Sequence, residues 1–226
     1  MLYSLLNGSA DLSQVILQLL ASVLVVLVIL PLHEMAHGFV AYKLGDDTAK
    51  RQGRITLNPL AHLNYLGAIC LILIGFGWAD PVPVNPRNFK NPKRDMALVA
   101  LAGPVSNLLA ALVGGLIFFA LTAWLLPVNM TLYLYISVFL EYYISVNIGL
   151  AVFNLIPLPP LDGSKILGAF LKTETYVKML SNERALSFIL LICVATGIVD
   201  KIVYYPRMWI EDLIMLLSSL PFLPFM

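Results

Sequence analysis

Long runs of apolar residues, separated by short polar segments, dominate this chain. Residues 12–42 and 96–126 are almost continuously apolar, and a third run begins near residue 131 and ends near Ile156 at a cluster of prolines. A helix needs about 20 apolar residues to cross a bilayer core, so each run predicts a membrane-spanning helix. Leu186–Val199 is a shorter fourth candidate, and residues 208–226 are either an interfacial helix or a tilted fifth span. The pattern predicts an all-α integral membrane protein, a polytopic helical bundle of about four to six membrane segments.

The region 55–95 departs from this pattern. Tyr65–Ala79 is apolar but contains only fifteen residues, and positively charged residues flank it on both sides. A full crossing would export one of those clusters, so we expect a re-entrant loop or a small β-hairpin. The stretch Asp80–Pro86 is extended by prediction, because each proline disfavours helical geometry in the residue before it. It forms either an exposed edge that binds another chain by backbone pairing or a plain surface loop.

Composition supports the membrane assignment. Of 226 residues, 60% are hydrophobic and 12% are charged, about half the charged share of a soluble domain. The net charge is +1 and no basic aromatic groove is present, so nucleic acid is not an expected partner. Cys70 and Cys193 lie in separate apolar segments and are expected to be core side chains. The N-terminus lacks a basic region and a cleavage site, which predicts a retained first span.

The distribution of lysines and arginines along the chain predicts the orientation of the protein in the membrane. Eight of the fourteen lie between Lys43 and Arg94, and four lie between Lys165 and Arg184. Because cytoplasmic segments carry an excess of these residues, we expect a multi-pass protein of the cell membrane with its N-terminus outside. We expect a single transmembrane domain over residues 1–226. Its expected parts are a first span (12–42), a re-entrant or extended region (55–95), a second span (96–126), a third span (131–172) and C-terminal helices (173–226).

The chemistry centres on His33-Glu34-Met35-Ala36-His37. Glu34 is the only charged side chain between residues 12 and 42. On a helix, His33 and His37 share one face and can bind one metal ion, and Glu34 can reach a water there as general base. A carboxylate inside hydrocarbon costs about 2.5–3.5 kcal/mol, which favours a functional role. The alternative is that both histidines are hydrogen-bonded within a helix bundle and have no metal, but it does not explain why a carboxylate, Glu34, is buried beside them. Among divalent metals, zinc is the one preferred here on the basis of the ligand type.

Two histidines leave a catalytic zinc one protein ligand short. His37 lies six residues before Lys43, which places the metal about 10 Å from the charged interface, near the cytoplasmic face. Glu141 lies about 20 Å from the corresponding end of its helix, whereas Asp162 follows directly after that helix breaks. Depth therefore favours Asp162 as the third ligand. The remaining histidine, His62, is expected to be structural or solvent-facing.

The helix break lies in Asn154–Gly163, where prolines occupy three of four consecutive positions. Prolines cannot continue a helix, so a rigid extended segment should turn at Gly163 into a further helix near Ser164–Leu171. Asn147 and Asn154 are seven residues apart and share a helical face. Asn154 is placed to donate to a substrate carbonyl or oxyanion. The alternative is an interhelical hydrogen bond.

Three motifs in order resemble the site-2 protease family of integral-membrane zinc metalloproteases. They are the H-E-x-x-H at His33, then Gly103-Pro104-Val105-Ser106-Asn107, then N-x-x-P-x-x-x-x-D-G from Asn154. The resemblance covers residues 15–170 and is of a minimal form without PDZ-like or CBS domains. It implies zinc ligation by His33, His37 and Asp162, acid/base catalysis by Glu34 and a substrate-side role for Asn154. Gly103 and Pro104 then form a close-packing point supported by Asn107.

We therefore expect a zinc-dependent intramembrane endopeptidase with one Zn²⁺, whose partners are the lipid bilayer and a membrane-protein or peptide substrate. A second hypothesis keeps the metalloprotease but gives it soluble or surface peptides that enter from the cytoplasmic side. A third is a metal transporter, since intramembrane His and Asp side chains can pass an ion along. The polar groups converge at one depth and do not line a path across the membrane, which disfavours transport.

Overall fold

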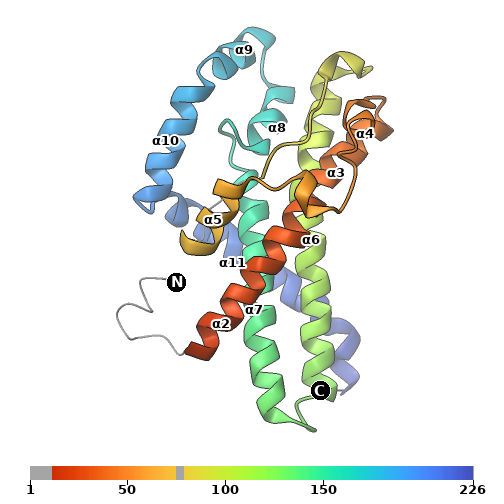
Figure 1. The fold of residues 1–226 in the computed structure, drawn as a ribbon, viewed down its shortest axis with the longest axis vertical. Coiled ribbons are helices and arrows are strands. Elements are labelled where there is room, and N and C mark those ends of the chain that lie inside the picture. The colour runs from red at the N-terminus through yellow and green to blue at the C-terminus, as the bar shows by residue number, and fades with distance from the viewer. Residues whose placement is uncertain (1–11, 75–78, 226) are drawn as a thin grey trace.

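The computed structural model describes residues 12–74 and 79–225, in which helices account for all regular structure and no β-strand occurs. The helices of at least eight residues are α2 (Leu12–Leu24), α3 (Leu30–Lys43), α5 (Tyr65–Ile74), α6 (Pro92–Trp124), α7 (Met130–Asn154), α8 (Asp162–Phe170), α9 (Thr173–Ser181), α10 (Glu183–Ala195) and α11 (Ile198–Ser219) (Figure 1). This confirms the all-α class. Within these described residues, three helices are long and apolar enough to cross a membrane, or four if α10 and α11 form one bent span.

The first span contains a π-helical segment, Val25–Ile29, that joins α2 to α3. Pro31 follows within the first turn of α3 and cannot donate to a carbonyl of the preceding turn. A wider π-helical turn accommodates that loss without ending the helix, so residues 15–43 remain one span. The irregular segment ends four residues before His33.

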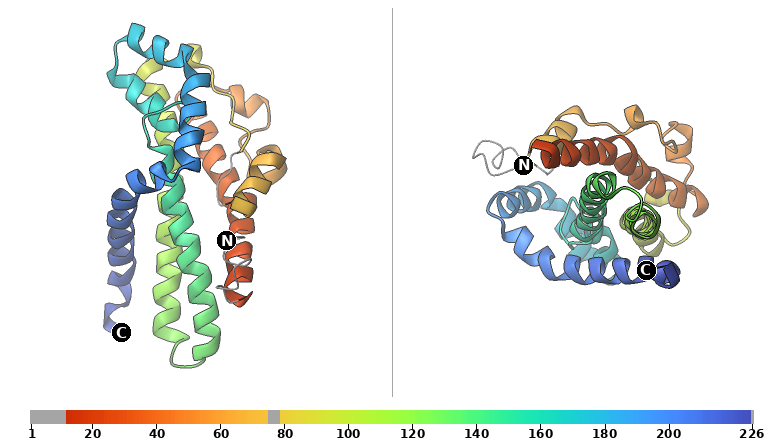
Figure 2. Two further views of the ribbon diagram at one scale, coloured as in Figure 1. Left: turned by 90° about the vertical axis from the view of Figure 1, so that its left-hand side faces the viewer. Right: turned by 90° about the horizontal axis from the view of Figure 1, so that it is seen from below.

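Helix α6 is the centre of the bundle. It contacts α3, α7, α8 and α11, and its contacts with α7 are the most extensive. Viewed along the bundle, α2 and α3 lie on one side of the α6–α7 pair and α11 lies on the other (Figure 2). The apolar core between α6, α7 and α11 includes Ala111, Ile148 and Ile214. Every helix that carries a predicted metal ligand therefore packs against α6.

The C-terminal part differs from the expected boundaries. The predicted segment Leu186–Val199 ends early, because Gly197 adopts a left-handed conformation (φ 72°) that terminates α10 at Ala195. Residues 198–219 then form one helix, so the boundary predicted at residue 208 is wrong. Helices α10 and α11 meet at an angle of 78°.

Helix α5 has ten residues and is about 15 Å long, which is too short to cross a bilayer core of about 30 Å. This length agrees with a re-entrant segment. The β-hairpin alternative is not found in the part of 55–95 that the structure describes, and residues 75–78 lie outside it. Residues 79–85 contain no helix or turn, and Asn85 at their end is extended, as their prolines predict.

One end of the molecule carries α4 (Thr48–Arg51), α8, α9 and the beginning of α6 (Figure 1). The two segments that contain twelve of the fourteen lysines and arginines lie largely there. We call it the basic end. Helix α8 begins two residues earlier than the sequence suggested, so Asp162 occupies its first turn.

Candidate metal centre

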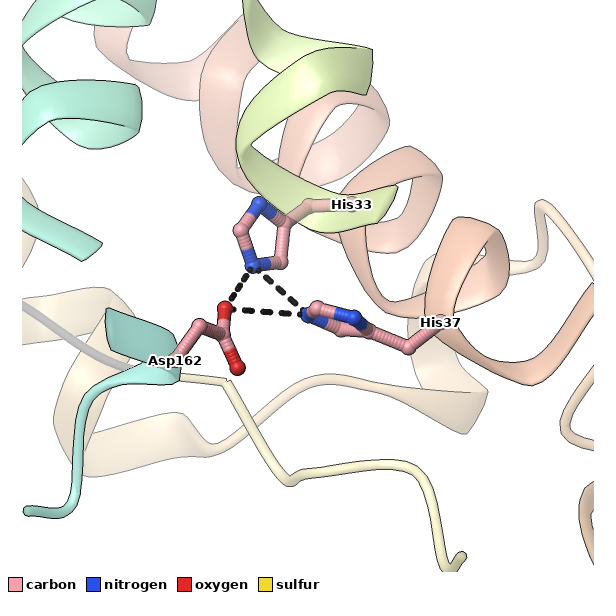
Figure 3. A group of neighbouring side chains, drawn as sticks. All are labelled: His33, His37 and Asp162. Atoms are coloured by element: carbon pink, nitrogen blue, oxygen red, sulfur yellow. Dashed lines mark hydrogen bonds and ion pairs between the residues drawn. The ribbon is translucent and has the colours of Figure 1, made fainter. Parts of the chain in front are cut away.

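Three predicted ligands meet in the interior of the bundle. His33 and His37 lie one turn apart on α3 and are 6% and 7% exposed. Their Nε2 atoms are 3.1 Å apart. The Asp162 Oδ2 atom lies 3.3 Å from Nε2 of His33 and 3.1 Å from Nε2 of His37 (Figure 3). Chain segments about 125 residues apart in the sequence thus point three donor atoms at one small volume.

The sharp return of the chain after α7 brings Asp162 to this point. Helix α7 ends at Asn154, and the prolines at 157, 159 and 160 prevent its continuation. The start of α8 then folds back against the end of α7. A Cβ atom on Gly163 would lie 2.3 Å from the carbonyl oxygen of Leu155, so only glycine fits there. Asp162 is 5% exposed, and its Oδ1 accepts from Nζ of Lys165 at 3.1 Å.

Helix α6 orients both histidine rings from the opposite side. Nδ1 of His37 donates to the carbonyl oxygen of Val99 at 2.7 Å, and Nδ1 of His33 donates to Oδ1 of Asn107 at 3.2 Å. Between these two residues lies Gly103, at the same four-residue interval. A Cβ atom there would lie 2.5 Å from both Nε2 atoms. The face formed by Val99, Gly103 and Asn107 is therefore shaped to fit the two rings.

Sequence reasoning missed Val99, because a backbone carbonyl leaves no trace in residue identity. It interpreted Gly103 as a close-packing point and Asn107 as its support. The structure is more specific, since both residues face the histidines themselves. The four-residue spacing of Val99, Gly103 and Asn107 repeats the spacing of His33 and His37, and that match was the available signal.

The donor set fits a divalent cation. A carbonyl oxygen only accepts, so His37 must carry its proton on Nδ1, and the bond to Asn107 favours the same tautomer in His33. Both Nε2 atoms then present lone pairs to one another and to a carboxylate oxygen. Their separations of 3.1–3.3 Å match the distance of about 3.3 Å between ligands of a tetrahedral zinc.

Glu34 is half-buried on the same helix, and its Oε2 accepts from the backbone N–H of Val82 at 2.9 Å. No described residue donates to its other oxygen, Oε1. Val82 belongs to the segment 79–88, which we call the strap. Val82 is buried, and its side chain lies where a Cβ atom on Gly38 would approach it to 3.2 Å. The strap therefore passes directly over α3 beside Glu34.

The strap is anchored by Asp46, which follows α3 and is fully buried. Its carboxylate accepts from the N–H of Asn85 at 2.7 Å, from Nδ2 of Asn88 at 2.7 Å, and from both the N–H and hydroxyl of Thr48. Burial raises the pKa of Asp46, but these hydrogen bonds outweigh it and leave the pKa below its usual value. The ionised carboxylate thus connects the strap to the end of the H-E-x-x-H helix.

Other polar residues singled out in the sequence lie apart from the cluster. Nδ2 of Asn154 donates to the carbonyl of Leu150 in its own helix, and no hydrogen bond joins Asn154 to the three clustered residues. Glu141 is exposed in the middle of α7. His62 is 1% exposed, so its side chain does not face solvent, and its Nε2 contacts the carbonyl of Thr56 at 2.9 Å.

Comparison with known proteins gives a consistent set of relatives. The family description "Peptidase family M50" matches residues 127–199. The chain is 44% identical over 161 residues to "Putative zinc metalloprotease YwhC" of Bacillus subtilis (strain 168), which covers 71% of this chain and 74% of that protein. It is 30% identical to "Putative zinc metalloprotease Rip2" of Mycobacterium tuberculosis H37Rv, over 83% of this chain and 71% of that protein. "Putative zinc metalloprotease MJ0611" of Methanocaldococcus jannaschii is 32% identical over 60% of this chain and 62% of its own length. No solved structure matches significantly.

Proposed function

Because the chain belongs to peptidase family M50, the site-2 protease family, we propose that this membrane metallopeptidase cleaves peptide bonds in or near transmembrane segments of membrane proteins. The convergence of His33, His37 and Asp162 beside Glu34 carries the proposal. In it, these three residues bind a single zinc ion and Glu34 is the catalytic acid/base. The multi-pass membrane character follows from the apolar helices.

A zinc ion at this site supplies a Lewis acid that acidifies water and polarises a peptide carbonyl. The protein's own groups prepare the site for that chemistry. Val99 and Asn107 fix the tautomers of the two histidines, and Lys165 offsets the negative charge on the outer oxygen of Asp162. The surrounding helices bury all three ligands and keep bulk water away.

Glu34 moves the proton. Its free oxygen, Oε1, takes a proton from the attacking water, whose oxygen bonds to the carbonyl carbon of the scissile peptide. Glu34 then returns that proton to the amide nitrogen as the carbon–nitrogen bond breaks, so the products are a carboxylic acid and an amine. The N–H of Val82 binds Oε2 and holds the carboxylate in one orientation during both transfers. Asn154 assists by donating to the oxyanion, which requires its amide to leave the Leu150 carbonyl.

The strap is the proposed binding edge for an unwound substrate. In an extended chain the N–H and C=O of one residue point to the same side, and successive residues alternate. The N–H of Val82 points to Glu34, so extended geometry directs the N–H and C=O of Val84 to that same side, and neither group has a hydrogen-bond partner among the described residues. Pro81 and Pro83, which have no N–H, face the other way. The strap therefore offers a one-sided edge directed at the catalytic groups.

The basic end is the proposed cytoplasmic end, which places the N-terminus outside. A site near that end is also open to soluble or surface peptides, and this is the second candidate function. Cleavage of one sequence with and without a membrane anchor distinguishes the two. Preference for the anchored form supports intramembrane proteolysis, whereas equal cleavage supports the second candidate.

The decisive experiment compares purified wild-type protein with Glu34→Gln and Asp162→Ala in lipid vesicles that contain a single-span substrate. We expect Glu34→Gln to bind zinc and to cleave nothing, because it keeps the ligands and lacks the base. Asp162→Ala should lose both zinc and activity. Cleavage by Glu34→Gln would refute the catalytic role, and full activity of Asp162→Ala would refute the ligand assignment.

A further inference from the structure

A cavity of about 310 Å³ lies at the basic end, outside the cluster of His33, His37 and Asp162. Its walls come from the end of the strap, the start of α6, the proline turn after α7, helices α8 and α9, and the first residue of α10. Its volume falls within the range of pockets that bind small molecules or side chains, about 300–1,000 Å³.

The walls are mainly apolar and rigid. Four prolines, Met96 and Leu180 line the cavity, and prolines offer no backbone N–H to a ligand. The prolines are Pro86, Pro92, Pro159 and Pro160. Three polar side chains of the lining have partners inside the protein. The Ser164 hydroxyl donates to Leu161, Nζ of Lys93 donates to the carbonyl of Leu171, and Nζ of Lys165 donates to Asp162. Tyr176 and Glu183 also line the cavity, and neither has a side-chain hydrogen bond among the described residues. Because prolines, Met96 and Leu180 form most of the wall, the cavity is suited to an apolar side chain.

Two chain segments connect the cavity to the catalytic groups. The strap contacts Glu34 at Val82 and lines the cavity at Pro86, four residues later. At about 3.3 Å per residue, those positions are up to about 13 Å apart along an extended chain. On the other side, Lys165 lines the cavity and contacts Asp162 at 3.1 Å. A peptide that lies along the strap from the scissile bond therefore reaches the cavity about four residues later.

We propose that this cavity is a specificity subsite for a bulky apolar side chain of the substrate, about four residues from the scissile bond towards the basic end. This inference rests on the proposed proteolytic function and on pairing of the substrate with the strap. It defines the substrate class as membrane proteins whose cleavage site is followed, on that side, by an extended segment with Leu, Ile, Phe or Met at that distance.

The test uses a library of single-span fusion proteins with randomised residues on both sides of the membrane boundary. Wild-type protein, Leu180→Trp and Val177→Trp each cleave the library in lipid vesicles, and mass spectrometry identifies the cleaved bonds. Leu180 lines the cavity and is 39% exposed, so the larger ring can fill the space. Val177 lies on the same helix, is exposed and does not line the cavity, which makes it the matched control.

We expect wild-type protein and Val177→Trp to select a large apolar residue about four positions from the cleaved bond. Leu180→Trp should reduce that selection by about tenfold or more in favour of Ala and Gly, with zinc content unchanged. Unchanged selection in Leu180→Trp, or no selection in the wild type, would overturn the subsite and leave the protease intact. A library that the wild type does not cleave at all would overturn the proposed function, and the subsite with it.

Cross-linking gives a second measurement that does not depend on activity. Leu180→Cys is introduced into Glu34→Gln protein in which Cys70 and Cys193 are replaced by Ser, and each substrate carries one cysteine at successive positions. We expect disulfide formation to peak about four residues from the scissile bond. An equal yield at every position would refute the subsite.

Discussion

Replacement of Gly103 by Ala tests the proposed metal centre most directly. Gly103 lies in the middle of α6, where alanine is the better helix former by about 1 kcal/mol. The added methyl group would nevertheless lie 2.5 Å from Nε2 of His33 and 2.5 Å from Nε2 of His37. It would therefore occupy the volume towards which the ligand atoms point. The substitution should stabilise helix α6 and weaken metal binding.

The size of the effect follows from the displacement required. An ordinary contact begins near 3.4 Å, so the rings must move by about 0.9 Å, well beyond the tolerance of about 0.2 Å for metal–ligand distances. Their Nδ1 bonds to Asn107 and Val99 oppose that movement. Loss of a supporting residue alone weakens metal binding by about 10–100-fold. We expect zinc affinity to fall by more than about 100-fold, or about 2.7 kcal/mol.

Stability of the zinc-free protein should change little. Loss of one or two neutral hydrogen bonds costs about 0.5–1.5 kcal/mol each, and the helix gains about 1 kcal/mol. Zinc affinity is measured in detergent by competition with a chromophoric chelator, and stability is measured by thermal unfolding followed by circular dichroism. Gly149→Ala is the control, because Gly149 lies within α7 and a Cβ atom there has no neighbour within 4 Å.

Gly149→Ala should bind zinc like the wild type and unfold at the same or a slightly higher temperature. If Gly103→Ala also bound zinc with wild-type affinity, the rings would have to be free to move away from α6. That result would refute the claim that the face of Val99, Gly103 and Asn107 shapes the metal centre.

Three further predictions follow from the same contacts. Asn107→Leu removes the hydrogen-bond acceptor for His33, so zinc affinity should fall about 10–100-fold. It also removes a buried Nδ2 that has no partner among the described residues, so the loss of stability should be small. Unchanged affinity in the chelator competition would contradict the orienting role of Asn107. Asp46 has a lowered pKa, so its stabilisation of the strap should be complete above about pH 4 and should disappear as the pH falls through the lower pKa of the folded protein. Limited proteolysis of the strap should therefore accelerate in acid, and in Asp46→Asn it should be fast at every pH; equal rates in both proteins near pH 7 would refute the anchor. Removal of zinc with a chelator should abolish cleavage, and addition of zinc alone should restore it. A zinc concentration 100 times Kd should also raise the free energy of unfolding of wild-type protein by about 2.7 kcal/mol, but not that of Asp162→Ala.

The same contacts link substrate binding to catalysis. The strap donates hydrogen bonds to Glu34 and Asp46 and accepts one from Arg54. Glu34 lies on α3, Asp46 lies three residues after its end, and Arg54 follows α4. The helix that carries two of the proposed metal ligands thus also fixes the edge that we propose for the substrate. A rigid connection of this kind keeps the substrate, the proposed general base and the proposed metal ligands in fixed relative positions.

Local sequence was sufficient to predict the three long apolar helices and the three residues that cluster in the structure, His33, His37 and Asp162. Apolar runs long enough to span a membrane predict helices in any tertiary context, because a backbone in lipid must satisfy its own hydrogen bonds. The i, i+4 spacing of His33 and His37 likewise requires only the geometry of one helix. Asp162 was selected as the candidate third ligand by its expected depth in the membrane, because the proline cluster fixes where α7 must end.

Only the tertiary structure decided what surrounds those residues. The carbonyl of Val99, the missing side chain of Gly103 and the amide of Val82 act on His33, His37 and Glu34 from other segments. Such contacts depend on how α3, α6 and the strap pack. A functional backbone carbonyl or a functional lack of a Cβ atom cannot be recognised from residue identity alone. The break at Gly197 and the cavity at the basic end have the same origin. The sequence determined which residues can do the chemistry, and packing determined how they are oriented and what reaches them.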